Sequence, residues 1–428
     1  MAWPNVSTSF EEGVSPYPSL NMEGARPVLE LRSLCHSPLL TFFFFMPKSL
    51  WVSINEETNR CCLQHIERRA QATLAQQGDR RRESLTQIRR RLMAKAGYKA
   101  HEILRVVSLL IARMLCPQRR RSTAHWTMTE AGAVPAGTFG RFMARNRCQD
   151  ILRDLHFVDN TADRTRDKLQ QRFLAGWSHP AVFSFDEGVL PRTSRRNTTR
   201  MFMPDKPHRY GSKMFMLCDS RTAYCHRFEM YAGKRNAGEC GDSTFDHKTG
   251  AAVVVRNLRA VFESKPRYPR HLVVIDRFYS SVLLAIELLG MGVYVIGTIM
   301  TDRLGFDKAV RASSKTRPAS IPRGGFAFSR SIAVPSMVAF HWWDNKPVHH
   351  LCTGSVMTAS TINRNVKRVG PESVPCSAAV NDYQRWMGRV DVHDQLRLQT
   401  YSLQTSTRSR KYYKSLFFGF IDLALVNA

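Results

Sequence analysis

Short apolar runs, rich in β-branched and aromatic side chains, set the fold class that this chain can adopt. They begin beyond Pro180 and are separated by stretches long enough for turns and helices. A helical pattern over Ser280–Met291 divides the last two runs, so strand and helix alternate as in an α/β core. The predicted strands are AVFSF (181–185), KMFML (213–217), HRFEMY (226–231), HLVVI (271–275) and VYVIGTIM (293–300).

The sequence pattern divides the whole chain into five expected segments. Residues 1–60 lack sustained periodicity, so we expect a poorly specified leader there. Residues 61–175 have a helical, basic pattern typical of a DNA-binding or dimerisation region. The first part of the core is expected over 176–300 and its last part over 381–428. Strand-like pieces such as FAFSRSI and SMVAFHWW indicate a β-rich insertion over 301–380.

Helical spacing is clearest in two places within the 61–175 segment. It runs from Glu67 to Cys116, where Pro117 ends it, and again over Thr138–Leu155. Each helix is expected to bury one apolar face. The apolar stripe of the first comprises Ile103, Val106, Val107, Leu110 and Ile111.

The charge of the chain favours a polyanionic partner. Lysine and arginine number 63 against 35 aspartates and glutamates, which gives a formal charge of +28. Nucleic acid is the first candidate, and a ribosome-associated or merely soluble basic protein is the alternative. Arginine triplets at Arg80–Arg82, Arg89–Arg91 and Arg119–Arg121 would contact DNA phosphates, direct nuclear import or form a solvated helix face.

Cysteine usage and hydropathy bear on the compartment. The 10 cysteines include no Cys-x-x-Cys pair, so neither a disulfide framework nor a zinc module is indicated and a reducing compartment fits best. Met1–Leu20 is too polar for a secretory signal, and no apolar run approaches the roughly 20 residues that span a bilayer. The strongest run, LLTFFFFM (39–46), is expected to be a buried strand or to belong to no fold.

Two aspartates directly follow predicted strands. Asp186 comes after AVFSF, and Asp276 comes after HLVVI. A carboxylate in this position is commonly a turn or helix cap. Two of them at the strand ends of one very basic α/β core also indicate a catalytic site.

A third acidic group lies in GRVDVHDQL. Asp391 and Asp394 are three residues apart, which puts both carboxylates on one helix face, where like charges need a cation between them. Carboxylates from two strands and one helix suit Mg²⁺ or Mn²⁺, because these ions prefer oxygen ligands. Two such ions would support phosphodiester hydrolysis and transesterification.

Taken together, several short sequence motifs resemble those of the piggyBac transposases, which have an RNase H-like DDE/D catalytic domain. The resemblance covers residues 100–428 and depends on the order and spacing of the motifs more than on any one of them. They are FGRFMARNRCQDILRDLHFVDN (139–160), FSFDEGVLP (183–191), KPHRYGSKMFMLCDS (206–220), VVIDRFYSS (273–281) and DYQRWMGRVDVHDQ (382–395).

The resemblance implies a set of catalytic residues and a reaction. Asp186, Asp276 and Asp391 match the three catalytic, metal-binding carboxylates, and Asp394 is similar to the family's additional acidic residue. It further implies nicking of double-stranded DNA at transposon ends with Mg²⁺, integration at TTAA targets, action as a homodimer and a nuclear location. The fold expected is an RNase H-like α/β core with a β-rich insertion and an N-terminal helical domain.

Some features depart from the family pattern. Arg277 stands where many relatives have Asn, so a guanidinium beside the site would steady a phosphate or compete with the metal. The segment from Asp167 to Phe173 is shorter than is usual, and the cysteine-rich zinc-binding tail is absent from this sequence. The alternative hypothesis is therefore a catalytically inactive, transposon-derived DNA-binding protein.

A few further residues could take part in binding. A basic stretch would hold the DNA backbone near Asp186, or else form a solvated loop. Trp342 and Trp343 would stack on a flipped base or, as we expect, pack in a core, and His393 is expected at the surface. The basic candidates are Lys206, His208, Arg209, Lys213 and, beside the second carboxylate, Arg277.

Overall fold

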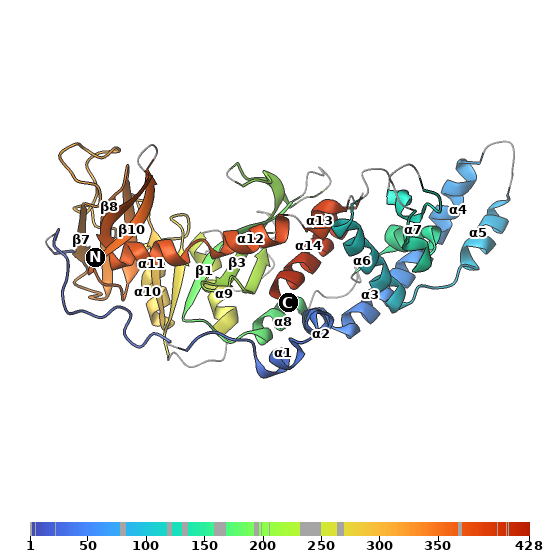
Figure 1. Ribbon diagram of the computed structural model, residues 1–428, viewed down its shortest axis with the longest axis horizontal. Helices are drawn as coiled ribbons and strands as arrows, with labels where there is room; N and C mark the ends of the chain where they lie inside the picture. Colours follow the sequence, from blue (N-terminus) through green and yellow to red (C-terminus); the bar gives the residue numbers. More distant parts are fainter. Residues whose placement is uncertain are drawn as a thin grey trace. The chain divides into compact units, whose positions relative to one another are not determined.

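The chain forms two compact units (Figure 1), and each is described by itself. The sheet unit comprises Met1–Ser33, Gln170–Leu396 and Asn427, and the helical unit comprises Leu34–Leu169, Arg397–Val426 and Ala428. The computed structural model describes all residues except 1, 5, 22, 78–82, 118–121, 131–135, 158–167, 192–196, 198, 205, 232–249, 263–268, 367–369, 400, 408 and 410.

One mixed sheet organises the sheet unit. Its order is β2-β3-β1-β5-β6-β9-β8-β7, with β4 also paired to β3. The β1-β5 and β5-β6 pairs are parallel and the other pairs are antiparallel, which confirms the mixed α/β class. The strands are β1 (Val182–Pro191), β2 (Arg200–Phe202), β3 (Tyr210–Asp219), β4 (Cys225–Met230), β5 (His271–Ile275), β6 (Val293–Thr298), β7 (Phe326–Arg330), β8 (Met337–Trp343) and β9 (Pro347–Thr353).

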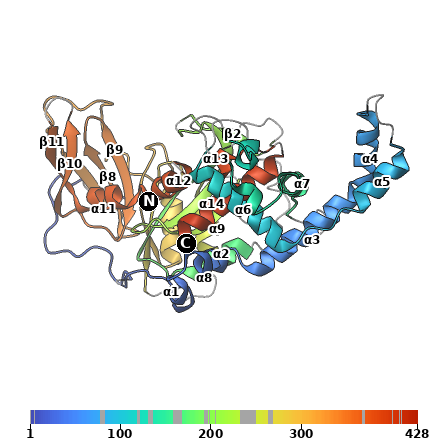
Figure 2. The ribbon, with the colours of Figure 1, turned by 45° about the vertical axis from the view of Figure 1, so that its right-hand side comes forward.

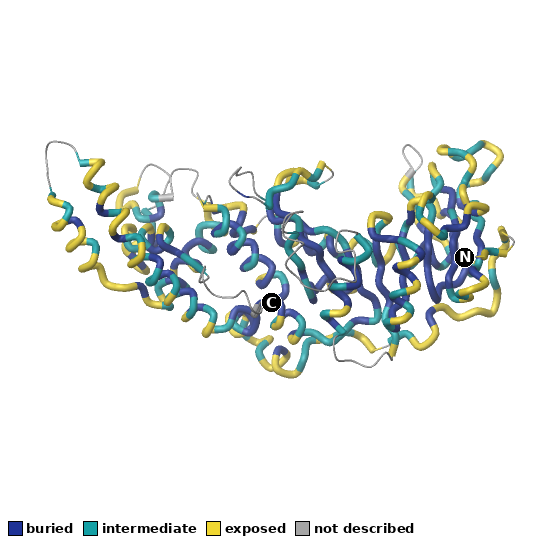
Figure 3. Tube along the Cα trace, turned by 180° about the vertical axis from the view of Figure 1, so that it is seen from behind, coloured by how far each residue is buried: buried dark blue, intermediate teal, exposed yellow. Residues whose placement is uncertain are grey.

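The central strands of this sheet are apolar on both sides, so other elements of the unit pack against both faces. Val273 and Ile275 of β5 pack with helices α9 (Gly250–Phe262) and α10 (Val282–Gly290). The alternate residues Leu272 and Val274 pack on the opposite face with helix α11 (Ala378–Trp386) and the hairpin β10 (Ala359–Val366) and β11 (Gly370–Ser377). Buried strands between partly exposed helices are visible in Figure 3.

Helix α10 connects the parallel strands β5 and β6, as the sequence pattern predicts. It begins where the side chain of Ser281 accepts a hydrogen bond from Leu284 N at 3.1 Å, which is the usual cap for a free N-terminal amide. Its buried residues Leu284 and Leu288 belong to the same core as α9. The sequence patterns used above do not predict α9.

Part of the segment 1–60 makes specific contacts in the sheet unit. The backbones of Ser7 and Phe328 pair in both directions, so this stretch extends along β7. The carboxylate of Glu11 forms an ion pair with Arg330 at 2.6 Å, and Tyr17 is buried. The expected leader and the other boundaries of the five-segment division remain predictions.

The apolar run LLTFFFFM forms a helix in the helical unit, so the predicted strand is wrong. Helix α2 (Pro38–Phe45) begins with Pro38 in its first turn, and Ser37 caps it by accepting from Leu40 N at 3.4 Å. Phe42, Phe44 and Phe45 are buried. A fully apolar run has no periodicity that separates a buried strand from a buried helix, and only the Ser-Pro start indicated the helix.

The rest of the helical unit consists of packed helices, and α4 and α5 lie side by side (Figure 2). The predicted stripe of α6 is confirmed at Ile103, Val106, Val107 and Leu110, which are buried, whereas Ile111 is only half-buried; Cys116 caps the end of the helix. The helices are α3 (Lys48–Gln64), α4 (Ile66–Ala75), α5 (Leu85–Met93), α6 (Ala100–Leu115), α7 (Arg145–Asp154), α13 (Leu403–Ser406) and α14 (Tyr412–Asn427).

The helix expected over Thr138–Leu155 is shorter than predicted. Only Phe139–Arg141 (a 3₁₀ turn) and α7 (Arg145–Asp154) are helical, because Ala144 has an extended backbone that separates them. Arg89–Arg91 spans part of α5, whereas Arg80–Arg82 and Arg119–Arg121 lie outside the described residues. Some helices contain residues of both units: α1 (Leu29–Leu34), α8 (Lys168–Gly176), α12 (Arg389–Leu398) and, through its last residue, α14.

Candidate active site

The first two predicted carboxylates lie on neighbouring parallel strands. Strands β1 and β5 pair in register, with Phe185 opposite Ile275, so Asp186 and Asp276 occupy the next position of each chain. Neighbouring strands lie about 5 Å apart, which brings the two backbones together. Asp276 follows the end of β5 as predicted.

The prediction that β1 ends at Asp186 is wrong. Strand β1 continues to Pro191, because β3 pairs with it along its whole length, with Asp186 opposite Met216. Strand β5 does end at Ile275. Asp186 is therefore left without a β5 partner because β5 ends at Ile275, and not because β1 turns at Asp186.

Strand periodicity places both carboxylates on one face of the sheet. Even-numbered Val182 and Val274 pack on the α11 face, so Asp186 and Asp276 point to that face too. Ser184 confirms the direction, since its hydroxyl donates to Met387 O at 3.1 Å. The α11 and α12 ribbons run along this part of the sheet in Figure 1.

Asp276 is held by the residues around it. Its Oδ1 accepts a hydrogen bond from Thr298 Oγ1 at 3.0 Å and another from Arg277 N at 2.5 Å. Its backbone oxygen accepts from Tyr279 N and Ser280 N. Thr298 lies on β6 one position beyond the pair Ile275–Gly297, so three adjacent strands contribute to one row of polar side chains.

Asp186 is half-buried, and burial raises the pKa of its carboxyl to about 7. A hydrogen bond from the backbone of Glu187 and the charge of Lys206 act in the opposite direction. The negative charges of Glu187 and Asp391 add to the increase. Asp391 and Lys206 are therefore electrostatic neighbours of the first carboxylate.

The third predicted carboxylate forms an ion pair. Asp391 Oδ1 of α12 accepts from Lys206 Nζ at 2.8 Å. The side chain of Asp391 is 54% exposed, whereas that of Lys206 is 21% exposed, so the ammonium is the more buried partner. The cation expected beside the α12 carboxylates is thus, in this structure, a lysine.

Asp394 has a different environment from Asp391, although both belong to α12. Asp394 is 8% exposed, and its Oδ2 accepts a hydrogen bond from Val189 N of β1 at 2.9 Å. A side chain on Gly188 would approach Asp394 Oδ1 to 3.1 Å and Met216 Sδ to 2.3 Å, which accounts for glycine there. Asp394 fastens α12 to the extended part of β1.

The donor set suits a hard divalent cation, with one obstacle. Asp186, Asp276 and Asp391 supply carboxylate oxygens from two strands and a helix, as Mg²⁺ and Mn²⁺ prefer. Within the described part of the chain, no three His, Cys, Asp or Glu side chains are close enough to hold an ion as they stand. The Asp391 carboxylate is paired with Lys206, and separation of that pair would free it.

Sequence analysis missed a second polar group on the opposite face. Glu187 follows Asp186 and therefore points to the α9 and α10 side, where it accepts hydrogen bonds from Tyr279 OH at 2.8 Å and Lys213 Nζ at 2.5 Å. The alternation of a strand through FDEG is the signal that could have assigned it. Lys213 is thereby engaged within the protein.

The other candidates divide by exposure. His208, Arg209 and Arg277 are exposed, and Arg277 directly follows Asp276 in sequence. Trp342 and Trp343 are buried, and Trp342 Nε1 donates to Pro375 O at 3.0 Å, as core packing requires. The surface position expected for His393 is wrong, because α12 buries it completely with its Nδ1 3.0 Å from Ala223 O.

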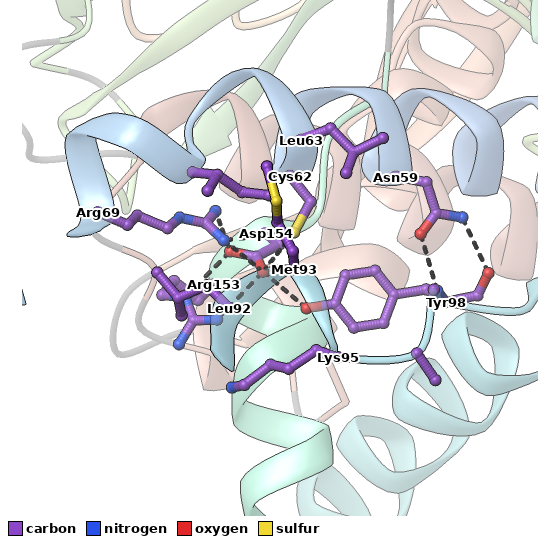
Figure 4. Close-up of a pocket in the computed structure, with 13 residues that line it drawn as sticks. Asn59, Cys62, Leu63, Arg69, Leu92, Met93, Lys95, Tyr98, Arg153 and Asp154 are labelled. Atoms are coloured by element: carbon purple, nitrogen blue, oxygen red, sulfur yellow. Dashed lines mark hydrogen bonds and ion pairs between the residues drawn. The ribbon is translucent and has the colours of Figure 1, made fainter. Parts of the chain in front are cut away.

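A cavity of about 170 Å³ lies in the helical unit beside Asp154 (Figure 4). Burial would raise the pKa of Asp154, but hydrogen bonds from Arg153 and Tyr98 and the charge of Arg69 lower it below its usual value. Tyr98 OH donates to Asp154 at 2.6 Å, and Arg69 donates at 3.0 Å. These charges neutralise one another in a structural network, so we do not assign catalysis to this cavity.

Comparisons with known proteins identify relatives of the chain. Residues 37–428 match the family model described as Transposase IS4. The human PiggyBac transposable element-derived protein 3 is 26% identical over 303 residues, covering 67% of this chain and 48% of that protein. The human Chimeric ERCC6-PGBD3 protein matches 303 residues at 26% identity, which is 27% of its length. The chain thus spans half or less of these relatives.

A solved structure has the same fold. It is described as the cryo-EM structure of piggyBac transposase synaptic complex with hairpin DNA. The TM-score is 0.67 at 19% sequence identity, and the match covers 95% of this chain and 76% of the other. Within the described residues of this chain, no helix is both long and apolar enough to cross a membrane.

Proposed function

Because this chain belongs to the Transposase IS4 family, in its piggyBac type, we propose that it is the catalytic core of a cut-and-paste DNA transposase. Its reaction would be metal-dependent phosphodiester cleavage and strand transfer at transposon ends. The observation that carries the proposal is the register of β1 and β5, which brings Asp186 and Asp276 side by side on one face. Helix α12 brings Asp391 to the same region.

The strand order supports an RNase H-like core. Strands β4, β3 and β1 are antiparallel neighbours, and β5 and β6 continue the sheet parallel to β1. This is the arrangement that the family resemblance leads us to expect. Asp276 follows the carboxyl end of β5, and Asp186 lies beside it on β1; the carboxyl ends of parallel strands are also where ligands bind in open α/β sheets.

Members of this transposase family generally use divalent metal ions. Asp186, Asp276 and Asp391 would hold Mg²⁺ or Mn²⁺, two ions in the simplest scheme. Such ions supply activation of a water or 3′-hydroxyl and stabilisation of the leaving oxygen. The protein's own part is to orient the ligands. Thr298 fixes one oxygen of Asp276, and Asp394 holds α12 against β1.

The partner proposed is double-stranded DNA. The solved structure of similar fold contains hairpin DNA, and the chain carries a formal charge of +28. The exposed residues His208, Arg209 and Arg277 would contact phosphates near the carboxylates. Recognition of transposon ends, TTAA targets, a homodimer and a nuclear location complete the proposal.

A second candidate function is that of a catalytically inactive DNA-binding protein derived from a transposon. The ion pair between Lys206 and Asp391 favours it, because one expected metal ligand is occupied. The two hypotheses share DNA binding and differ in cleavage.

Cleavage of a labelled duplex bearing candidate transposon ends, with Mg²⁺ or Mn²⁺, separates them. Asp276→Ala should abolish nicking, and Asp302→Ala, which removes an exposed carboxylate beyond β6, should leave nicking intact. Nicking that persists in Asp276→Ala would refute the assigned site. Salt-sensitive DNA binding without nicking in the wild-type chain would favour the inactive derivative.

A further inference from the structure

We propose that Lys206 is an internal cation that competes with a divalent metal ion for Asp391. The Lys206–Asp391 pair would be a resting state, and metal binding would require the ammonium to leave the carboxylate. The inference rests on the proposed function, since it concerns the same carboxylates. It adds a control on metal binding that is built into the chain.

The position of the ammonium is the first observation. Lys206 Nζ lies 2.8 Å from Asp391 Oδ1, and its side chain is only 21% exposed, against 54% for its partner. A surface ion pair would leave the flexible lysine as the more exposed member. Here the ammonium is the more buried member of the pair, and the charge of Asp186 on β1 also acts on it.

The charges around Lys206 are the second observation. Besides its hydrogen bond to Asp391, the Lys206 ammonium is close enough to Asp186 and Asp394 for their negative charges to act on it. Lys206 therefore faces carboxylates from both β1 and α12. A cation in the active site would meet Asp186 and Asp391 as well.

The backbone delivers Lys206 to this place. It lies in the short connection between β2 and β3, where Phe202 and Tyr210 are paired. Met203 N donates to Arg209 O at 2.7 Å, which closes the connection into a turn. Lys206 N donates to Met203 O at 3.4 Å, so the backbone of Lys206 is bonded to the residue at which this turn begins.

Two cations cannot share one carboxylate at little cost. At a separation of about 4 Å, Coulomb repulsion between an ammonium and a divalent ion is more than about ten times thermal energy at the effective dielectric of a protein surface. Since the described side chains form no three-ligand metal group as they stand, the bound state requires a change at the site. Release of Asp391 by Lys206 is the smallest change that frees a carboxylate.

Mn²⁺ titration in the absence of DNA tests the inference, with free Mn²⁺ followed by electron paramagnetic resonance. Lys206→Met should bind Mn²⁺ about tenfold more tightly than the wild type, because a like charge is removed. Lys206→Arg keeps the charge and should stay within about twofold. Lys213→Met is the matched control, since this lysine pairs with Glu187 on the other face. Asp276→Asn should weaken Mn²⁺ binding, which tests whether the ion binds at the proposed site.

The outcomes are distinct. Unchanged or weaker Mn²⁺ binding by Lys206→Met would overturn the competition. If Asp276→Asn binds Mn²⁺ as the wild type does, the proposed function fails at this site, whatever Lys206 does. Should Lys206→Met not fold by circular dichroism, acetylation of Lys206 in the wild type, quantified by mass spectrometry, decides instead. Saturating Mn²⁺ should increase its rate several-fold, and an unchanged rate would refute the inference.

Discussion

The strands and the helix that form the candidate site hold their carboxylates in different ways. Asp186 and Asp276 are placed by the pairing of β1 with β5, and their backbones are fixed whatever their side chains do. Asp391 and Asp394 of α12 each contact a residue far away in sequence: Lys206 for the first and Val189 for the second. The register of β1 and β5 fixes the positions of Asp186 and Asp276, whereas side-chain contacts determine the environments of Asp391 and Asp394.

The two aspartates of α12 differ in their contacts, so we expect them to have different roles. Asp391 is exposed and its partner is the Lys206 side chain, so under our proposal its carboxylate becomes available to a metal ion when that pair separates. Asp394 is buried and bonded to backbone, so it is fixed. Although they are three residues apart on one helix, we expect the first to matter for cleavage and the second mainly for stability.

Asp391→Asn should have the largest effect on activity. We expect metal-dependent nicking to fall by roughly 10³-fold or more, because one ligand oxygen loses its charge. The free energy of unfolding should change by less than about 1 kcal/mol, since the lost ion pair is half-exposed. Cleavage assays and urea unfolding measure the two quantities. Near-normal nicking would show that α12 supplies no ligand through Asp391.

Asp394→Ala should act chiefly on stability. Val189 N loses a buried acceptor, which lowers the free energy of unfolding by about 1–3 kcal/mol. Urea unfolding of this variant beside Asp391→Asn tests the contrast directly. A stable Asp394→Ala variant that fails to cleave DNA would reverse the division proposed for α12.

Thr298→Val sharpens the contrast on the strand side. Removal of the hydroxyl takes away a donor to Asp276 Oδ1, and we expect Mn²⁺ affinity to fall about tenfold, as for other residues that orient a ligand. Thr298→Ser keeps the hydroxyl and should restore the affinity. Equal binding by both variants would mean that the register alone orients Asp276.

The sequence predicts the strand part of the site better than the helix part. The short apolar runs before Asp186 and Asp276 predict two strands, although they show neither that these strands pair nor that β1 continues to Pro191. Spacing puts Asp391 and Asp394 on one helix without showing which is buried. That depends on Lys206 and Val189, whose contacts arise only when distant segments meet.

The same limit explains the errors elsewhere. The run LLTFFFFM has no period, so its helix could not be told from a strand by hydrophobicity. His393 looks polar among acidic neighbours, yet its helix buries it against Ala223. In contrast, four of the five residues predicted for the apolar stripe of α6 are buried, because this pattern repeats over several turns.

We expect the smallest effect for substitutions of basic residues, which compare an exposed residue with a paired one in DNA binding. Arg209 is exposed in the turn before β3, whereas Lys213 lies within β3 and is paired with Glu187. Arg209→Ala should weaken binding by roughly two- to fivefold and reduce the salt slope by about 1, while Lys213→Ala should change neither. Fluorescence anisotropy with one duplex at several salt concentrations measures both. A loss confined to Lys213→Ala would mean that the strand, rather than the turn, meets the phosphates.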